Sequence, residues 1–240
     1  MHELCQYRPD VICLQEADKF PFIQWMLHKA GFAGHFQPKP DSPCVHLPGN
    51  SGPDGCAIFY NMRKFAALQV NSTVLQVGGL ATNQVALAVT LRDRQTKNVI
   101  TVVTTHLKAR KSEELARYRA EQGADLVRWA GLIAGPNPTI ITGDFNATRA
   151  EPVYKVMTDK YSSAYCDNPA ANAGPSNWTA RAGEPETTQT VDYLYYTKRG
   201  LSCSALLDMQ IDELDSPVPS ARYPSDHFSL AGKFTFFKSN

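Results

Sequence analysis

Short apolar runs rich in β-branched residues recur along most of this chain, and helix-like stretches separate only a few of them. The runs cover residues 11–14, 56–60, 66–75, 84–91, 99–105, 140–142, 190–196, 201–207 and 228–237. Apolar residues at helical spacing occur at 20–30, 112–130 and 151–158. Strands that follow one another without an intervening helix favour antiparallel pairing, with the helices packed outside. We therefore predict an α/β fold of mainly antiparallel sheets, in one domain over residues 1–240.

Composition narrows the classes of protein to which the chain can belong. Its 240 residues are 43% hydrophobic, which allows a substantial core, and no apolar run is long enough to insert into a membrane as a span. A formal net charge of +1 gives no strong field that favours a membrane surface or a long nucleic acid. The six cysteines form no C-x-x-C pair, so we expect free thiols and an intracellular protein, cytoplasmic or mitochondrial.

Five of the apolar runs end in a chemically capable polar group. These strand ends are Leu14-Gln15-Glu16, Thr105-His106, Gly143-Asp144-Phe145-Asn146, Val191-Asp192-Tyr193 and Ser225-Asp226-His227. Each has an ordinary explanation when taken alone, because a single acid or histidine after a strand is more often solvated than functional. Asp144 and Asn146 are two residues apart, so an extended chain points them the same way. Five such ends together indicate one site.

The side chains at these ends suit metal-assisted attack of water on phosphorus. Glu16, Asp144, Asn146 and Asp226 offer hard oxygen ligands, which suit Mg²⁺. His227 can take a proton from water if a carboxylate such as Asp192 fixes its tautomer. His106 and Asn146 can donate hydrogen bonds to a phosphoryl group.

The ordered set Leu-Gln-Glu, Thr-His, Gly-Asp-Phe-Asn, Val-Asp-Tyr and Ser-Asp-His resembles that of the endonuclease/exonuclease/phosphatase superfamily, and the resemblance covers nearly all of the chain. It implies a four-layer α/β sandwich, in which two packed β-sheets are flanked by helices. It also implies roles for seven residues: Glu16 as a Mg²⁺ ligand with Asp226 beside the metal, Asp192 and His227 as the orienting pair around the catalytic base, Asp144 at the nucleophile or leaving group, and Asn146 and His106 on phosphate oxygens. The family begins with a strand that carries an asparagine near the metal, and we expect that strand to be missing here.

Further segments resemble the deadenylase-related branch of this superfamily. They are residues 36–40, 42–44, 52–57, 82–86, 105–110 and 223–227. This resemblance implies either a phosphatase that removes the 2′-phosphate of NADP(H) or a 3′-exoribonuclease that acts on poly(A) RNA. The absence of the first strand motivates a third alternative, a non-catalytic binding or regulatory protein.

Clustered cations favour the phosphatase. A phosphomonoester carries about −1.5 to −2 charge at neutral pH, whereas an internal phosphodiester carries one. Lys108 and Arg110 are two apart, so an extended segment puts both on one side, and Lys39 and Arg181 lie in loops that can join them. The alternative for each is a solvated surface cation. With Asn83, these are the predicted substrate-binding residues of a monomer that acts on NADP(H).

Overall fold

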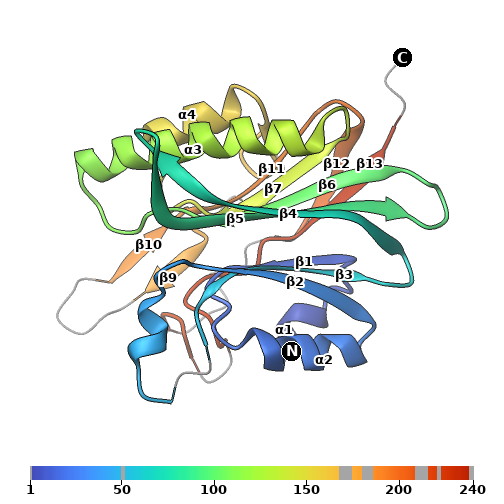
Figure 1. Ribbon diagram of the computed structural model, residues 1–240, viewed down its shortest axis with the longest axis horizontal. Coiled ribbons are helices and arrows are strands. Elements are labelled where there is room, and N and C mark those ends of the chain that lie inside the picture. Colours follow the sequence, from blue (N-terminus) through green and yellow to red (C-terminus); the bar gives the residue numbers. More distant parts are fainter. Residues whose placement is uncertain are drawn as a thin grey trace.

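Two β-sheets lie face to face in the computed structural model, and helices cover their outer faces (Figure 1). The structure describes residues 2–49, 52–167, 175–179, 186–208, 216–220 and 223–237. Four layers follow one another, from a helical layer through the smaller sheet and the larger sheet to a second helical layer (Figure 1). The predicted four-layer α/β sandwich is confirmed.

The smaller sheet has three antiparallel strands in the order β1-β3-β2. Its strands are β1 (Val11–Leu14), β3 (Gly55–Asn61) and β2 (Phe32–Pro38). The helices on its outer face are α1 (His2–Cys5) and α2 (Phe20–Lys29). Leu27 of α2 packs there against Ile12 and Phe59, all fully or nearly fully buried.

The larger sheet has six strands in the order β4-β5-β6-β7-β11-β8. They are β4 (Phe65–Val77), β5 (Leu80–Asp93), β6 (Val99–His106), β7 (Thr139–Asp144), β11 (Asp192–Tyr196) and β8 (Ser162–Ser163). All neighbours pair antiparallel except β6 and β7, which are parallel. The crossover between these two is α3 (Glu113–Ala134), which covers the outer face together with α4 (Pro152–Thr158).

Alternation along β5 explains how one strand serves two interfaces. Val85, Leu87 and Val89 point toward the smaller sheet and share a core with its β3, whereas Ala86 and Ala88 point toward α3. Successive side chains of a strand face opposite sides, so the larger side chains fill the space between the sheets and the alanines let a helix approach closely.

Short elements complete the described chain. They are the 3₁₀ turn η1 (Pro43–His46) and the paired strands β9 (Asn177–Thr179) with β10 (Thr187–Gln189) and β12 (Leu201–Leu206) with β13 (Gly232–Phe236). The six cysteines are free thiols. None of the described helices has the length and apolar content needed to cross a membrane.

The sequence prediction differs from the structure at four strands. β2 and β8 were not predicted, and β9 and β10 lie in a stretch predicted as loop. In β2 the apolar pattern is interrupted by Gly34, which leaves room for the Phe59 ring because a Cβ there would lie 2.3 Å from it. The other three strands have two or three residues each, too few to show an alternating pattern.

Candidate active site

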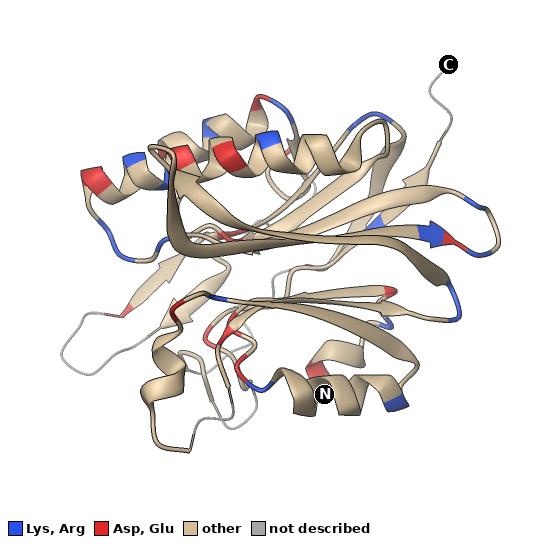
Figure 2. Cartoon of the chain, in the orientation of Figure 1, with Lys and Arg blue, Asp and Glu red and all other residues tan. Residues whose placement is uncertain are grey.

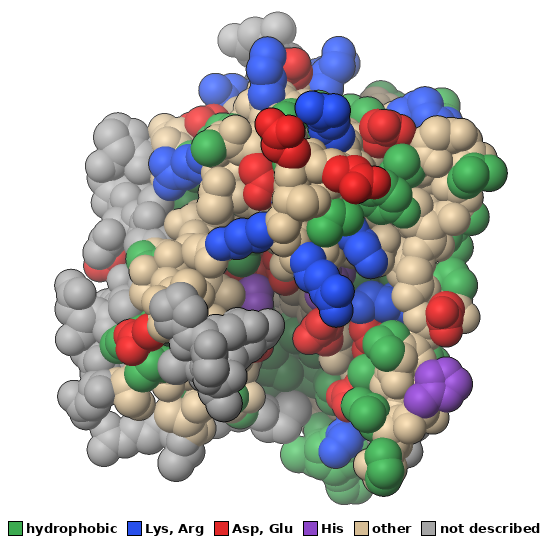
Figure 3. All heavy atoms as spheres, turned by 90° about the vertical axis from the view of Figure 1, so that its left-hand side faces the viewer, with side chains coloured by type: hydrophobic (Ala, Val, Ile, Leu, Met, Phe, Trp, Pro, Cys, Tyr) green, Lys and Arg blue, Asp and Glu red, His purple; other side chains and the backbone are tan. Residues whose placement is uncertain are grey.

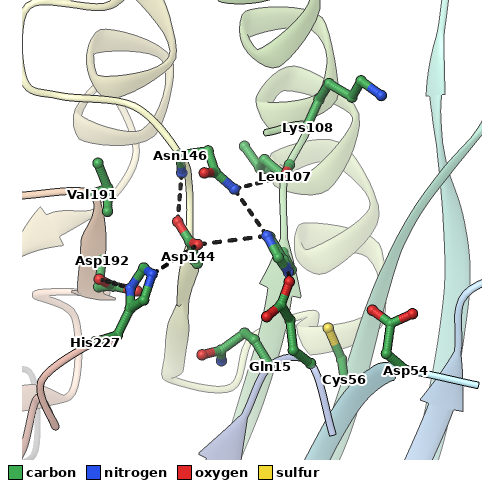
Figure 4. Close-up of polar contacts among 12 residues, drawn as sticks. Gln15, Asp54, Cys56, Leu107, Lys108, Asp144, Asn146, Val191, Asp192 and His227 are labelled. Atoms are coloured by element: carbon green, nitrogen blue, oxygen red, sulfur yellow. Dashed lines mark hydrogen bonds and ion pairs between the residues drawn. The ribbon is translucent and has the colours of Figure 1, made fainter. Parts of the chain in front are cut away.

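Three polar side chains lie together where three adjacent strands of the larger sheet end or begin. β7 runs parallel to β6, which sets His106 opposite Asp144. β7 also runs antiparallel to β11, which sets Asp192 opposite the same Asp144. The ends of three adjacent strands therefore present an imidazole and two carboxylates at one place (Figure 4).

Asp192 fixes the orientation of His227. Its Oδ2 accepts hydrogen bonds from His227 Nδ1 at 2.7 Å and from Ser176 Oγ at 2.6 Å. A backbone bridge to Asn177 holds the same histidine. Because Nδ1 donates to the carboxylate, Nε2 is the ring nitrogen left for chemistry, and it lies 3.9 Å from Asp144 Oδ2 (Figure 4).

Burial and charge set the protonation of this trio. Burial lowers the pKa of His227, but the hydrogen bond and charge of Asp192, with Asp144 and Asp226, outweigh it and raise the pKa to about 9. Burial raises the pKa of Asp144 to about 8, and the charge of Asp192 adds to that effect. At neutral pH the trio therefore retains protons that an added cation would repel.

Asn146 and His106 form a second pair next to Asp144. Asn146 Nδ2 lies 2.9 Å from His106 Nε2 and donates to the carbonyl of Leu107 at 3.1 Å. An amide donor at Nε2 requires that the ring proton sit on Nδ1, which is buried and has no hydrogen-bond partner in the part of the chain that the structure describes. Burial, with Lys39 and His227, lowers the pKa of His106 to about 3, so its 3.5 Å approach to Asp144 Oδ2 is not an ion pair.

We had predicted that an extended chain points Asp144 and Asn146 the same way, but the structure brings the two side chains together through a turn. Asn146 adopts a left-handed conformation with φ 50°, and its N–H bonds Asp144 Oδ1 at 2.7 Å. This turn brings the Asn146 amide to His106. Asparagine tolerates the left-handed backbone conformation better than most residues, because its short side chain can hydrogen-bond locally.

Glu16 lies at the end of β1 and faces His106 from the smaller sheet. Gln15 Nε2 donates to Thr104 Oγ1 at 2.8 Å, which ties this strand end to β6. Glu16 has φ 51°, and its carboxylate is 67% exposed with Oε1 3.9 Å from His106 Nδ1. Glu16 therefore offers an accessible carboxylate next to the buried Nδ1 of His106.

The donor set fits a hard divalent cation. Asp144, Asp192 and His227 offer ligand atoms within 4.8 Å of one another. Asp192 Oδ2 and His227 Nδ1 are already bonded to each other, so this trio suits proton transfer better than full coordination. The accessible Glu16 carboxylate offers an oxygen ligand for a cation, and Asp144 becomes a second one when it loses the proton that its raised pKa retains.

Lys39 reaches the site from the end of β2. Its Nζ lies 2.5 Å from Asp54 Oδ2, and both side chains are largely buried. Asp54 in turn accepts from the Ser42 hydroxyl, and its own N–H donates to Ser42 Oγ at 2.9 Å. The charge of Lys39 helps to lower the pKa of His106, so the ammonium lies within electrostatic reach of that ring.

The cations that follow β6 lie in a bent loop and not in an extended segment, which corrects the prediction for Lys108 and Arg110. Arg110 has φ 76° and is exposed. The Lys108 side chain extends away from Asp144 (Figure 4). Basic side chains mark this loop between β6 and α3 (Figure 2), and the space-filling view shows Lys and Arg above a hollow that contains a histidine (Figure 3).

Two other predicted substrate residues stand apart from these. The Asn83 side chain accepts from the Asp41 N–H at 2.8 Å and donates to the Asp41 carbonyl, which anchors the loop after β2 to β5. Arg181 lies outside the described residues.

Sequence reasoning missed Ser176 and Asp54. Ser176 Oγ accepts from the N–H groups of Val191 and Asp192 at 2.9 and 3.0 Å while it donates to the Asp192 carboxylate. A serine and an aspartate in loops carry no pattern that marks them, and only the fold brings them to the site.

Comparison with known proteins supports a relationship over the whole described fold. A family model described as "Endonuclease/Exonuclease/phosphatase family" matches residues 2–227. Nocturnin of Drosophila melanogaster is 40% identical over 98% of this chain and 40% of its own length. The exoribonuclease subunit Ccr4 of the CCR4-Not complex of Yarrowia lipolytica is 25% identical over 99% of this chain and 43% of its own.

A solved structure agrees. The human Nocturnin catalytic domain with a bound sulfate anion superposes with a TM-score of 0.83 at 36% identity, over 98% of this chain and 83% of that one. The chain spans less than half the length of the fly and yeast relatives. It belongs to the Endonuclease/Exonuclease/phosphatase family, as a nocturnin-like member.

Proposed function

We propose that this chain is a Mg²⁺-dependent phosphohydrolase that removes the 2′-phosphate of NADP(H), giving NAD(H) and phosphate. One observation carries the proposal: the loop with Lys108 and Arg110 is bonded directly to the candidate catalytic residues. Leu107 N–H donates to the Asp144 carbonyl at 2.9 Å, and the Leu107 carbonyl accepts from Asn146 Nδ2. A cationic segment beside a site for phosphorus chemistry suits a doubly charged phosphomonoester.

The proposed roles follow from the contacts. In the neutral form of His227, Nε2 takes a proton from the attacking water, and Asp192 stabilises the resulting imidazolium through the 2.7 Å hydrogen bond. The water oxygen bonds to phosphorus as the bond to the ribose 2′-oxygen breaks. Asp144 holds a proton near neutral pH and gives it to that leaving oxygen.

His106 binds a phosphoryl oxygen, and Asn146, whose two Nδ2 protons go to His106 Nε2 and the Leu107 carbonyl, holds the ring in place. The proton on His106 Nδ1 has no hydrogen-bond partner among the described residues, so a phosphate oxygen that reaches it can accept it. Because the pKa of His106 is so low, the ring donates as a neutral imidazole and keeps its tautomer.

Glu16 and Asp226 are the residues that we propose to hold Mg²⁺. When bound, the ion supplies charge stabilisation for the transferring phosphoryl group. Lys39, Lys108 and Arg110 supply positive charge for the phosphomonoester, and Asn83 supports the loop of Lys39. Arg181 is proposed with them from the sequence alone. The sulfate bound by the human Nocturnin catalytic domain supports an anion-binding role for this branch.

The test is release of inorganic phosphate from NADPH with Mg²⁺. We expect turnover by the wild type and loss of it in Glu16→Ala and His227→Ala. Asp159→Asn, at an exposed ion pair with Lys155, is the matched control and retains activity. No turnover above the Glu16→Ala background would refute the phosphatase.

Similarity to an exoribonuclease subunit supports a second candidate, a poly(A) 3′-exoribonuclease. It predicts AMP release from oligo(A) that is lost in His227→Ala. Arg110→Ala separates the two candidates, because loss of a charged hydrogen bond is worth roughly 1.5–3 kcal/mol, or about tenfold to a hundredfold. A selective loss on NADPH supports the phosphatase, and equal losses on both substrates contradict a specificity role for Arg110. Ligand binding without turnover of either substrate would indicate the non-catalytic alternative.

A further inference from the structure

The inner face of α3 buries a charged side chain where an apolar one would pack. Arg119 is 1% exposed and Gln122 is fully buried, and both lie on the face that also carries Leu126. Residues three and seven apart share one side of a helix. A buried ion pair is weak evidence for stability, because desolvation offsets the attraction between the charges. The buried guanidinium therefore calls for another explanation.

Its hydrogen bonds all lead to the ends of two loops. Arg119 Nε and Nη2 donate to Glu151 Oε2 at 2.9 and 2.6 Å. Arg119 Nη1 donates to the carbonyl of Lys108 at 3.0 Å and to that of Arg110 at 2.7 Å. Three guanidinium nitrogens thus connect the loop after β6 to the residue that precedes α4.

Gln122 continues this connection. Its Oε1 accepts from the Lys108 N–H at 3.1 Å, and its Nε2 donates to Gln84 Oε1 at 2.8 Å and lies 3.3 Å from Thr82 Oγ1. The backbone of Lys108 is therefore held by α3 at both its N–H and its carbonyl.

The loop after β6 has a backbone conformation that is unfavourable without these contacts. Arg110 has φ 76°, in the left-handed region, which costs a non-glycine residue free energy unless the surroundings determine it. On the other side of the loop, Leu107 is bonded to Asp144 and Asn146. Arg110 is exposed and Lys108 is half-buried, but the backbone of both is fixed.

We propose that Arg119 is a positioning residue that presents Lys108 and Arg110 to an anionic substrate. Arg119, with Glu151 and Gln122, forms the buried clamp that sets the loop conformation, so the fork of the guanidinium matters and not only its charge. That the substrate is NADP(H) rests on the proposed function. That Arg119 sets the conformation of the loop does not depend on the proposed function.

The first measurement needs no substrate. The quantity measured is the ratio of the amide hydrogen exchange rate at Lys108 to the rate at the adjacent Leu107, whose N–H is held by the Asp144 carbonyl. In Arg119→Lys we expect this ratio to be at least about tenfold higher than in the wild type. Arg117→Lys, on the exposed face of the same helix, is the matched control and leaves this ratio unchanged. An unchanged ratio in Arg119→Lys would overturn the clamp.

The second measurement links the clamp to binding. With NADPH, Arg119→Lys is expected to raise KM roughly tenfold to a hundredfold with a smaller effect on kcat, since small misplacements have effects of this size. The same substitution is expected to add little in a Lys108→Ala/Arg110→Ala background. Independent, multiplicative losses would contradict action through the loop.

A milder variant covers the case in which Arg119→Lys does not fold. Glu151→Gln keeps an acceptor for the guanidinium but removes the charge, and it is expected to speed exchange at Lys108 in the same sense; an unchanged exchange ratio there would refute the clamp. If the wild type does not turn over NADPH, the proposed function fails while the exchange ratio still decides the clamp.

Discussion

Replacing Asp192 with asparagine should shift the protonation of His227 by a large and measurable amount. The pKa of His227 is raised from 6.5 to about 9, a difference worth roughly 3.4 kcal/mol between the two protonation states. The hydrogen bond and charge of Asp192 are the main causes of that rise, and burial acts against them. An asparagine keeps an acceptor for Nδ1 but has no charge, so we expect the pKa to fall to about 7 or below.

The assay is an NMR titration of labelled histidine in metal-free buffer, with His227→Gln to assign the signal. Asp159→Asn serves as the control, because it removes a carboxylate at an exposed ion pair with Lys155. A His227 pKa within half a unit of the wild-type value in Asp192→Asn would refute the reasoning. A wild-type pKa near 6.5 would refute it too.

The same linkage predicts a change in stability with pH. His227 has a folded pKa above its unfolded value, so its stabilisation is fully present below pH 6.5 and is lost as pH rises through about 9. Asp144, whose raised pKa lies near 8, acts in the same direction below that pH, because the unfolded chain loses its proton first. Urea unfolding at pH 6.5 and 9 should show a smaller loss in Asp192→Asn, since both shifts shrink.

Three further predictions concern the residues around Asp144. Asp144→Asn should raise the unfolding midpoint at pH 8 without divalent cations by about 2–4 °C for each kcal/mol of buried charge penalty removed, and a lower midpoint in calorimetry would contradict the raised pKa. Phe145→Ala should cost about 3–5 kcal/mol in urea unfolding, because its ring is 1% exposed and packs edge-on against Tyr195; a cost below about 1 kcal/mol would mean that the cavity collapses. Gly143→Ala should lower the free energy of unfolding by more than about 2 kcal/mol, since its Cβ would lie 2.1 Å from the Thr105 carbonyl oxygen. Gly131→Ala, in open space on α3, should instead raise it by about 0.5–1 kcal/mol. Similar effects of the two substitutions would contradict these expectations.

Sequence patterns predicted the core elements because their physical signals are local. The run from Val11 to Leu14 is a strand in the structure, and the helix predicted at 112–130 is α3, extended to Ala134. Asp144 and Asp192 were predicted to belong to one site, and strand register places them opposite each other.

The rest depended on contacts between distant segments. The left-handed turns at Asn146 and Arg110 replace the extended geometry that residue spacing had indicated. The buried pair of Arg119 with Glu151 joins residues 32 apart in the chain, and a helical pattern alone marks Arg119 as an interruption of an apolar face. Lys39 was predicted as a substrate-binding cation, and only the fold shows that its ammonium is paired with Asp54.

The alignment of His106, Asp144 and Asp192 on three adjacent strands would make the proposed activity a reporter of correct strand assembly. No contiguous peptide of the chain contains the site, and a slip of one residue in β7 would turn Asp144 to the opposite face of the sheet. Insertions in connecting loops that do not contact the site leave the alignment intact, whereas a single deletion inside β6 or β7 removes it. A library of deletions screened only for phosphate release would therefore map the strand boundaries without any structural measurement.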